Sequence, residues 1–317
     1  MTKIKLYVYP HASPHVHDTE AAEHYYDTVP MSKEGIDRHC EIVSPEHADF
    51  FYMGQFTNNQ SMTNHKPQDF DYWEGNEERH ICDYEGEGGQ ERGAGGFPIP
   101  EWLHKSILTI NGPLKKYNHI KNLFVRPTFS HLLLDIVKNR REIFPFPTEK
   151  SVGFRGYLNC NVRLLMANAI YNSTGVKHDI VMNQSWSGPS AIGSSVQQDY
   201  IDGLLRNPIS LCPRGSGIDS VRLIETCFYR RVPVLISDYD YLMVGEDHYD
   251  TSFCFRICDP YMTENFFLEE LYKVYSFSID DLRERAQLAR KYFDDVILTY
   301  FNDPTLYFLK WLHNERR

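Results

Sequence analysis

Short strand-like runs alternate with helical patterns through the second half of the chain, and this alternation constrains the fold more than any other feature. Strands that alternate with helices predict βαβ units and a parallel sheet. The chain ends in two further helical patterns. The strand-like runs are residues 152–156, 180–182, 209–212, 232–237 and 254–257, and the helical patterns are residues 162–171, 198–206, 219–230, 279–300 and 305–314.

The first half follows a weaker version of the same pattern. Residues 4–9 form a β-rich run that Pro10 stops, and residues 44–53 read as a one-turn helix that leads into a second strand. From residue 58 to residue 100, glycine and acidic residues replace hydrophobic periodicity, which predicts a long loop that serves either as a lid or as a flexible insertion. Other predicted elements are an extended segment at 40–43, helices at 20–26, 102–110 and 129–139, and a strand at 123–125.

Composition limits the classes of function. The chain has 317 residues, enough for about two domains, and 42% of them are apolar. The net charge of −10 disfavours general binding to nucleic acid or to an anionic membrane. No apolar run approaches ~20 residues, and the N-terminal strand is too short for a signal peptide, so we expect a soluble cytoplasmic protein. Seven cysteines without a CxxC pair argue against a disulfide framework or a zinc ribbon.

Residues 209–238 carry the strongest chemical signal. A strand is followed by a loop with Arg214, Gly215 and Gly217, and then by a helix capped by Asp219 or Ser220. Glycines allow a ligand to approach the backbone, an arginine fork suits phosphate or carboxylate, and a helix N-terminus attracts anions. The segment therefore predicts an anion site.

The helix that follows this loop predicts a second polar contact. Val221, Ile224 and Phe228 share one face, which we expect to be the core face, while Arg222 and Glu225 lie three residues apart on another. A carboxylate there suits the two hydroxyls of a ribose. The alternative is a surface ion pair beside an ordinary glycine turn. The spacing matches neither the Rossmann glycine motif nor the Walker loop.

The run Leu211-Cys-Pro-Arg-Gly-Ser-Gly, the helix Ser220-Val-Arg-Leu-Ile-Glu225 and the strand Val232-Pro-Val-Leu-Ile-Ser-Asp238 closely resemble the signature of exostosin-type glycosyltransferases (glycosyltransferase family 47). Three other segments are similar to that family: residues 4–10, residues 44–52 and the Phe154-Arg155-Gly156 turn. The likeness spans residues 4–295. It departs from the family at residues 58–127, which leaves the acceptor open, and in lacking the membrane anchor of most members.

The resemblance implies a GT-B architecture, in which two facing Rossmann-like α/β domains enclose a cleft. The expected domains are an acceptor-side domain at 1–147, a nucleotide-sugar domain at 148–295 and a C-terminal helix at 296–317 that packs back across them. The implied reaction is an inverting transfer from a UDP-sugar to a hydroxyl of a glycan, with no metal or other cofactor required. The implied donor-binding residues are Arg155, Arg214, Gly215, Ser220, Arg222 and Glu225.

An inverting transfer needs a base for the acceptor hydroxyl and a counter-charge for the leaving diphosphate. We expect Arg155, Arg214 and the helix end to meet the charge and Asp18 or His15, in the loop after the first strand, to act as the base. Glu87 and Glu91 are rival bases. A D-x-D pair that could hold a divalent cation occurs at Asp238 and Asp240, and again at Asp69 and Asp71. The histidines at 11, 15 and 17 make a poor structural zinc site.

Two other functions compete with this reading. A nucleotide-sugar epimerase would need an N-terminal G-x-G-x-x-G, which residues 8–20 do not provide. A non-catalytic member could instead bind a glycan or a nucleotide sugar as the partner of another transferase. Arg214 and Glu225 favour donor binding in either case, and turnover alone distinguishes the two.

Overall fold

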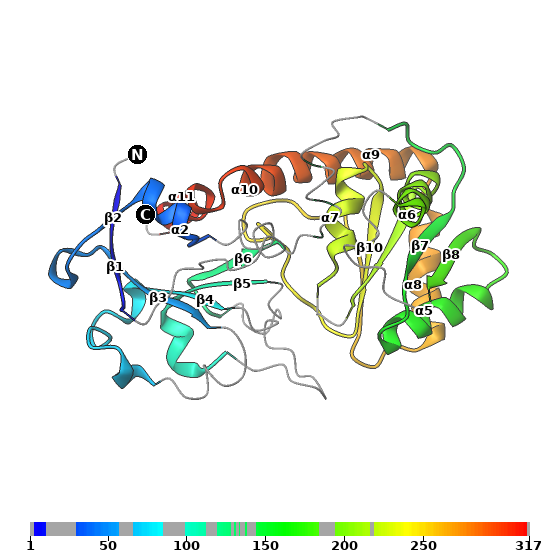
Figure 1. Cartoon of the computed structure of the whole chain (residues 1–317). Helices are drawn as coiled ribbons and strands as arrows, with labels where there is room; N and C mark the ends of the chain where they lie inside the picture. The colour runs from blue at the N-terminus through cyan, green and yellow to red at the C-terminus, as the bar shows by residue number, and fades with distance from the viewer. Residues whose placement is uncertain are drawn as a thin grey trace. The chain divides into compact units, whose positions relative to one another are not determined.

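The computed structural model divides the chain into two α/β units, each built on a parallel sheet (Figure 1). The first comprises Met1–Pro127, Tyr241–Val244 and Leu298–Arg317, and the second comprises Thr128–Asp240 and Gly245–Ile297. The expected α/β class with two Rossmann-like sheets is confirmed. The structure describes residues 3–10, 30–56, 66–84, 99–111, 119–127, 130, 133, 137, 144–183, 194–215 and 219–315.

The expected domain boundary was residue 147, whereas the two units divide after Pro127. The C-terminal residues from Leu298 onward are grouped with the first unit.

The first unit holds a sheet of six parallel strands in the order β2-β1-β3-β4-β5-β6. Apolar side chains of its C-terminal helices pack on strand β6, where Phe124 lies edge-on to Phe308 with 5.1 Å between ring centroids. Its elements are β1 (Ile4–Val8), α2 (Lys33–His39), β2 (Cys40–Ile42), β3 (Phe50–Phe56), β4 (His80–Tyr84), β5 (Ile107–Asn111), β6 (Leu123–Arg126), α10 (Leu298–Asn302) and α11 (Pro304–Glu315).

Two predictions for the first half were wrong. The predicted helix at 102–110 is a 3-10 turn over Glu101–Lys105 followed by strand β5. The predicted loop at 58–100 contains strand β4, whose short apolar core at Ile81 and Cys82 is fully buried between β3 and β5. In both segments the pairing strands come from distant parts of the chain. The predicted helix at 20–26 and most of the one at 129–139 lie outside the described residues.

A polar group ties three strands of this sheet together. Asp83 on β4 is fully buried, and its carboxylate accepts hydrogen bonds from Tyr52 on β3, at 2.8 Å, and from Thr109 on β5. Burial raises the pKa of Asp83, and the nearby cation of Arg126 on β6 opposes the rise. Buried polar groups are tolerated when they are hydrogen-bonded in this way.

The second unit follows the predicted alternation closely. Its five parallel strands have the order β11-β10-β9-β7-β8, and the core between sheet and helices is built from aliphatic and aromatic side chains. Helix α8 (Glu264–Ser276) has no counterpart among the predicted elements. The other elements are β7 (Val152–Tyr157), α5 (Asn161–Tyr171), β8 (His178–Asn183), α6 (Ser195–Arg206), β9 (Ile209–Pro213), α7 (Val221–Phe228), β10 (Val232–Ser237), β11 (Phe255–Cys258) and α9 (Ile279–Tyr292).

The strand order of this unit reverses direction at β7. From β7 the chain crosses to β8 on one side and then returns past β7 to β9 on the other side. Right-handed crossovers therefore place α5 on one face of the sheet and α6 and α7 on the other, as Figure 1 shows. In open α/β sheets, ligands bind at the carboxyl ends of the strands where the order reverses, which here means the loops after β7 and β9.

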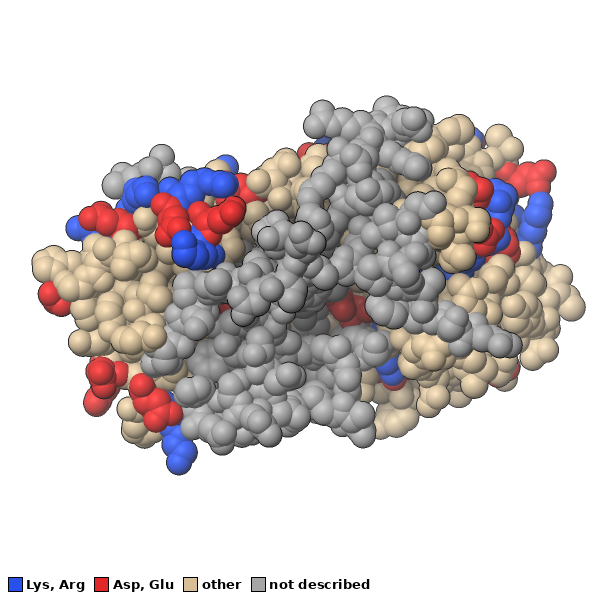
Figure 2. Space-filling model, in the orientation of Figure 1, with Lys and Arg blue, Asp and Glu red and all other residues tan. Residues whose placement is uncertain are grey.

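The surface carries charges of both signs. On the face seen in Figure 2, positive and negative side chains of the described residues lie intermixed, without a field of one sign. No helix within the described ranges combines the length and the apolar composition that crossing a bilayer requires.

Candidate functional site

Arg163 lies at the point where the strand order reverses. Helix α5 begins four residues after β7, which places Arg163 in its first turn, beside the loop that follows β9. Its Nε donates to the carbonyl of Arg214 at 3.0 Å, and one terminal nitrogen donates to the carbonyl of Tyr157 at 2.7 Å. A Cβ on Gly215 would lie 3.2 Å from the other terminal nitrogen. The glycine therefore leaves space over the guanidinium that a larger residue would take.

The charge of Arg163 has no counterpart nearby. Within the described ranges, no carboxylate lies in ion-pair distance of its guanidinium. Burial and the neighbouring cation of Arg222 lower the pKa of Arg163 to about 10. A half-buried cation with cationic neighbours is stabilised by an anion. Sequence analysis missed this residue, although a cation in the first turn after the Phe-Arg-Gly strand was a usable signal.

Arg214 forms the other side of this site, and the structure pairs it within the protein. Its guanidinium holds both carboxylate oxygens of Asp238, the second at 2.6 Å, and lies 5.5 Å from the ring centre of Tyr239. A third nitrogen donates to the carbonyl of Gly215 at 2.9 Å. Asp240, the other residue of that D-x-D pair, binds Arg256 at 2.9 Å. The two carboxylates thus fix arginine side chains.

Ser220 is the N-cap residue of α7, as expected, but its side chain does not cap the helix. The hydroxyl donates to the carbonyl of Pro213 at 3.1 Å and ties the end of β9 to the start of α7. The first turn of α7 therefore receives no hydrogen bond from the Ser220 side chain, which suits an anion-binding helix end.

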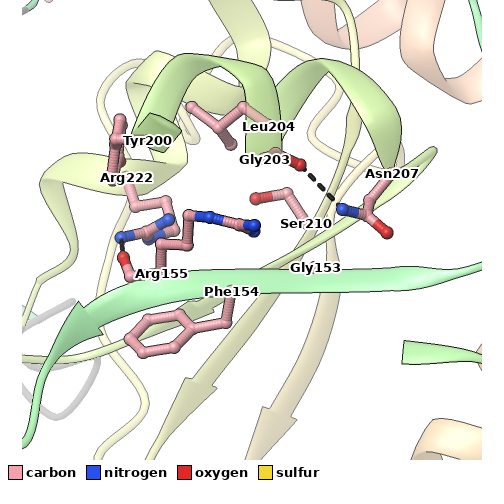
Figure 3. A pocket seen from close by; sticks show the side chains of 9 residues that line it. All are labelled: Gly153, Phe154, Arg155, Tyr200, Gly203, Leu204, Asn207, Ser210 and Arg222. Carbon is pink, nitrogen blue, oxygen red and sulfur yellow. Dashed lines mark hydrogen bonds between the residues drawn. The ribbon is translucent and has the colours of Figure 1, made fainter. Parts of the chain in front are cut away.

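Arg155 was expected to face the diphosphate, and the structure places it under helix α6. Its guanidinium pairs with Asp179 and with Asp199, each at 2.9 Å, and is 8% exposed. A Cβ on Gly203 would approach it to 2.4 Å. Figure 3 shows Arg155 and Gly203 at a gap between β7 and α6 that is too small to hold a water molecule. Two carboxylates already neutralise the charge of Arg155.

The predicted core face of α7 is confirmed for Ile224 and Phe228, which are 6% and 4% exposed, but the prediction was wrong for three other residues of the helix. Val221, expected in the core, is 37% exposed, whereas Arg222 and Glu225 are 8% and 2% exposed. The guanidinium of Arg222 lies between two aromatic rings, 4.5 Å from the centre of Phe154 and 4.6 Å from that of Tyr200, and donates to the carbonyl of Arg155. Stacking on both faces makes the interior acceptable to this cation.

Glu225 is held by two hydroxyl groups of the protein. One carboxylate oxygen accepts from Ser130 and the other from Tyr200 on α6. Burial raises the pKa of Glu225, while the Arg222 cation and the two hydrogen bonds oppose the rise. In this arrangement Glu225 accepts hydrogen bonds from the protein in the field of the buried Arg222 cation, and the expected ribose contact stays a prediction.

The structure brings Arg214, Gly215 and Ser220 together with Arg163, and it brings Arg155, Arg222 and Glu225 together in a buried group that adjoins Arg163 through Arg222. The expected base, Asp18 or His15, stays a prediction because those residues lie outside the described part. The same holds for His11, His17, Glu87, Glu91 and Gly217.

No protein-family model matches the chain, and no curated protein matches it. Among solved structures it is similar to the crystal structure of TarM, with 15% sequence identity and a TM-score of 0.35 over 83% of this chain and 59% of that one. It is also similar to the crystal structure of the GtfA/B complex, with 9% identity and a TM-score of 0.32 over 75% of this chain and 57% of that one. The chain thus spans less than two thirds of either structure's length. Similarity at this level indicates no function.

Proposed function

We propose that this chain is a glycosyltransferase of the exostosin type and that its second unit binds the diphosphate of a nucleotide sugar. The observation that carries the proposal is the cation of Arg163, which no carboxylate of the described residues neutralises, at the reversal of strand order beside Gly215 and the first turn of α7. Backbone amides, a glycine and an arginine fork together suit a diphosphate.

The site residues have different parts in this proposal. Arg163 contacts the diphosphate directly, and Arg214, fixed by Asp238, holds the loop and adds to the positive field. Arg155 is a positioning residue, because Asp179 and Asp199 already pair with it.

In the proposed reaction, the acceptor hydroxyl attacks the anomeric carbon of the donor from the face opposite the diphosphate, which inverts the configuration. Asp18 or His15 takes the hydroxyl proton. The leaving diphosphate gains negative charge as the glycosidic bond breaks, and cations positioned beforehand stabilise that charge. Arginines and a helix end supply this charge without a metal, so we propose transfer from a UDP-sugar in the absence of divalent cations.

Thermal stability tests donor binding. The melting temperature is measured with UDP, UDP-sugars and GDP-sugars at millimolar concentration, each with Mg²⁺ and with EDTA. A ligand at ~100 times its dissociation constant adds ~2.7 kcal/mol to the free energy of unfolding. We expect a shift with uridine nucleotides that survives EDTA. A shift that requires Mg²⁺ would contradict the metal-independent reaction and direct attention to Asp238 and Asp240.

Variants of Arg163 connect this shift to the site. R163A should weaken UDP binding about 10- to 100-fold, because it removes hydrogen bonds to a charged group, and R163K should retain part of the affinity because it keeps the charge without the fork. R283A is the control, since Arg283 pairs with Asp280 on the outer part of α9. Equal UDP affinity in R163A and R283A would remove Arg163 from the site.

Release of free UDP from a UDP-sugar separates an enzyme from a binding protein. We expect slow hydrolysis in the absence of acceptor, detected as free nucleotide. Tight UDP binding without release from any donor would favour the non-catalytic alternative, in which the site recognises a nucleotide sugar only.

A further inference from the structure

A second cavity lies at the C-terminal end of α7, at the other end of that helix from the donor site. Its volume is about 300 Å³, and it opens between the end of α7 and the outer turns of α9. The side chains that matter here are Phe144, Phe228, Tyr229, Arg230, Arg290 and Asp294.

Arg230 holds a backbone conformation that favours glycine. Helix α7 ends in a Schellman motif, in which the amide of Arg230 donates to the carbonyl of Cys227 at 3.1 Å and the amide of Arg231 donates to that of Thr226 at 3.0 Å. Arg230 has a φ of +56°, the left-handed region, where a Cβ crowds the backbone. Ending the helix requires this turn but not an arginine side chain, so the choice of arginine needs another reason.

The guanidinium of Arg230 has unused binding capacity. Its Nε is buried and receives no hydrogen-bond partner, and no carboxylate within the described ranges pairs with it. Arg290 is held in place, because one terminal nitrogen donates to the carbonyl of Phe228 at 2.8 Å and its Nε binds Asp294 at 3.0 Å. Among the described residues that line the cavity, two guanidiniums face one carboxylate, which leaves one positive charge.

Aromatic rings form the apolar part of the cavity. Phe228 and Tyr229 meet edge-on with 5.0 Å between ring centres, and Phe144 lies 5.5 Å from Tyr229. A second backbone irregularity borders the same cavity, since α9 passes into a π-helical turn at Phe293–Ile297 that carries Asp294. Such turns occur frequently at functional sites.

We propose that this cavity binds a small ring compound that carries one carboxylate. The carboxylate lies between Arg230 and Arg290, and the ring packs against the aromatic side chains. One carboxylate matches the single net charge, and planar arginine forks bind carboxylates in pairs of hydrogen bonds. The volume is at the lower end of the range for small-molecule sites, which suits a single ring. This site does not rest on the proposed transferase function.

Ligand titration by saturation-transfer NMR tests the proposal with three probes: benzoate, glucuronate and acetate. Benzoate supplies an aromatic ring, glucuronate a pyranose ring, and acetate the carboxylate alone. We expect at least one ring probe to bind about tenfold more tightly than acetate, and R230G to weaken that binding about tenfold. R230G should also keep or raise the melting temperature, because glycine relieves the left-handed strain. R283A is the control, because Arg283 lies on the same face of α9 as Arg290 but outside the cavity. This variant should bind the probes as the wild type does.

The proposal would be overturned if acetate bound as tightly as both ring probes, or if R230G bound the ring probe with unchanged affinity. The absence of binding of any probe at 10 mM would overturn it as well. A loss of binding in R283A as large as that in R230G would likewise point to general charge attraction and against a site.

Discussion

At the scale of single residues, the behaviour of α7 depends on two buried charges. Arg222 and Glu225 lie inside the second unit, where each charge is supported by the other and by polar or aromatic groups from elsewhere. Removing one member of such a pair leaves the other charge buried and unpaired, which costs more free energy than the pair contributes.

Glu225→Ala should therefore lower the free energy of unfolding by about 3–5 kcal/mol, because it strands the Arg222 cation and the hydroxyls of Ser130 and Tyr200. Glu225→Gln should cost about 1–2 kcal/mol, since an amide still accepts one hydrogen bond. Urea unfolding measures both. The UDP affinity of the folded E225Q protein then distinguishes a structural role from a ribose contact. An unchanged affinity means that Glu225 is structural, and a large loss of affinity supports the predicted contact with the ribose.

The sequence pattern indicated the strand-loop-helix segment that the proposed donor site uses, but it did not indicate Arg163. Arg214, Gly215 and Ser220 could be predicted because they are consecutive parts of one strand-loop-helix segment. The burial of Glu225 could not, because Tyr200 and Ser130 reach it from segments 25 and 95 residues away in the sequence. Helical spacing shows which residues share a face, and only tertiary contacts decide which face is buried.

At the scale of elements, Gly203 shows how one residue fits a helix to a strand. Glycine inside a helix costs about 1 kcal/mol relative to alanine. Arg155 on β7 requires it nonetheless, since the guanidinium is fixed by two ion pairs and occupies the space where a Cβ would lie.

Gly203→Ala should lower the free energy of unfolding by about 1–3 kcal/mol despite the better helix propensity, because the side chain of Arg155 cannot move aside without losing its partners. Val196→Ala on the same helix is the control: Val196 is 48% exposed, so its replacement should change stability by less than about 0.5 kcal/mol. Urea unfolding of the two variants is sufficient. A G203A protein more stable than the wild type would mean that Arg155 is not fixed between β7 and α6.

The strands β3, β4 and β5 share Asp83, and this gives the first unit a defined dependence on pH. Burial raises the pKa of Asp83 in the folded state above its ordinary value near 4. The folded protein then holds the proton more tightly than the unfolded chain does. That contribution to stability is complete at low pH and is lost as the pH rises through the folded pKa.

The free energy of unfolding of the wild type minus that of Asp83→Asn should therefore fall as the pH rises from 4.5 to 7.5. The comparison uses urea unfolding at several pH values. A cost of the substitution that does not depend on pH shifts every difference equally and leaves the slope unchanged. Asp281→Asn should show a nearly flat difference over this range, because a hydrogen bond from Ser278 lowers the pKa of Asp281 and the group is already ionised in both states. A flat difference for D83N would mean that Asp83 is ionised at all of these pH values.

Elements of the second unit were easier to predict than those of the first for a physical reason. In the second unit, each apolar run is short, contains β-branched residues and is bounded by a helical pattern. The local sequence therefore determines that the run forms a strand. The run at 102–110 lacks such bounds, and residues 107–111 become a strand because β4 and β6 lie on either side to pair with them. A short apolar run is ambiguous until its partners are known.

At the scale of the whole molecule, both units are parallel sheets, so each presents strand carboxyl ends and loops to a ligand at one edge. The described residues of the proposed donor site all belong to the second unit, whereas the expected base precedes β2 in the sequence of the first. Donor binding and proton transfer are thus assigned to different units, and donor binding alone should affect mainly one of them.

Hydrogen exchange with and without UDP tests this division. We expect UDP to increase the protection of backbone amides at residues 158–163 and 211–215, because the diphosphate orders the loops around Arg163 and Gly215 and restricts their local opening. The strands of the first unit should change little when no acceptor is present. R163A measured under the same conditions should lose the added protection, which ties the effect to the cation. Protection that is largest over β4, β5 and β6 would place the nucleotide in the first unit and would contradict the assignment of donor binding to the loops after β7 and β9.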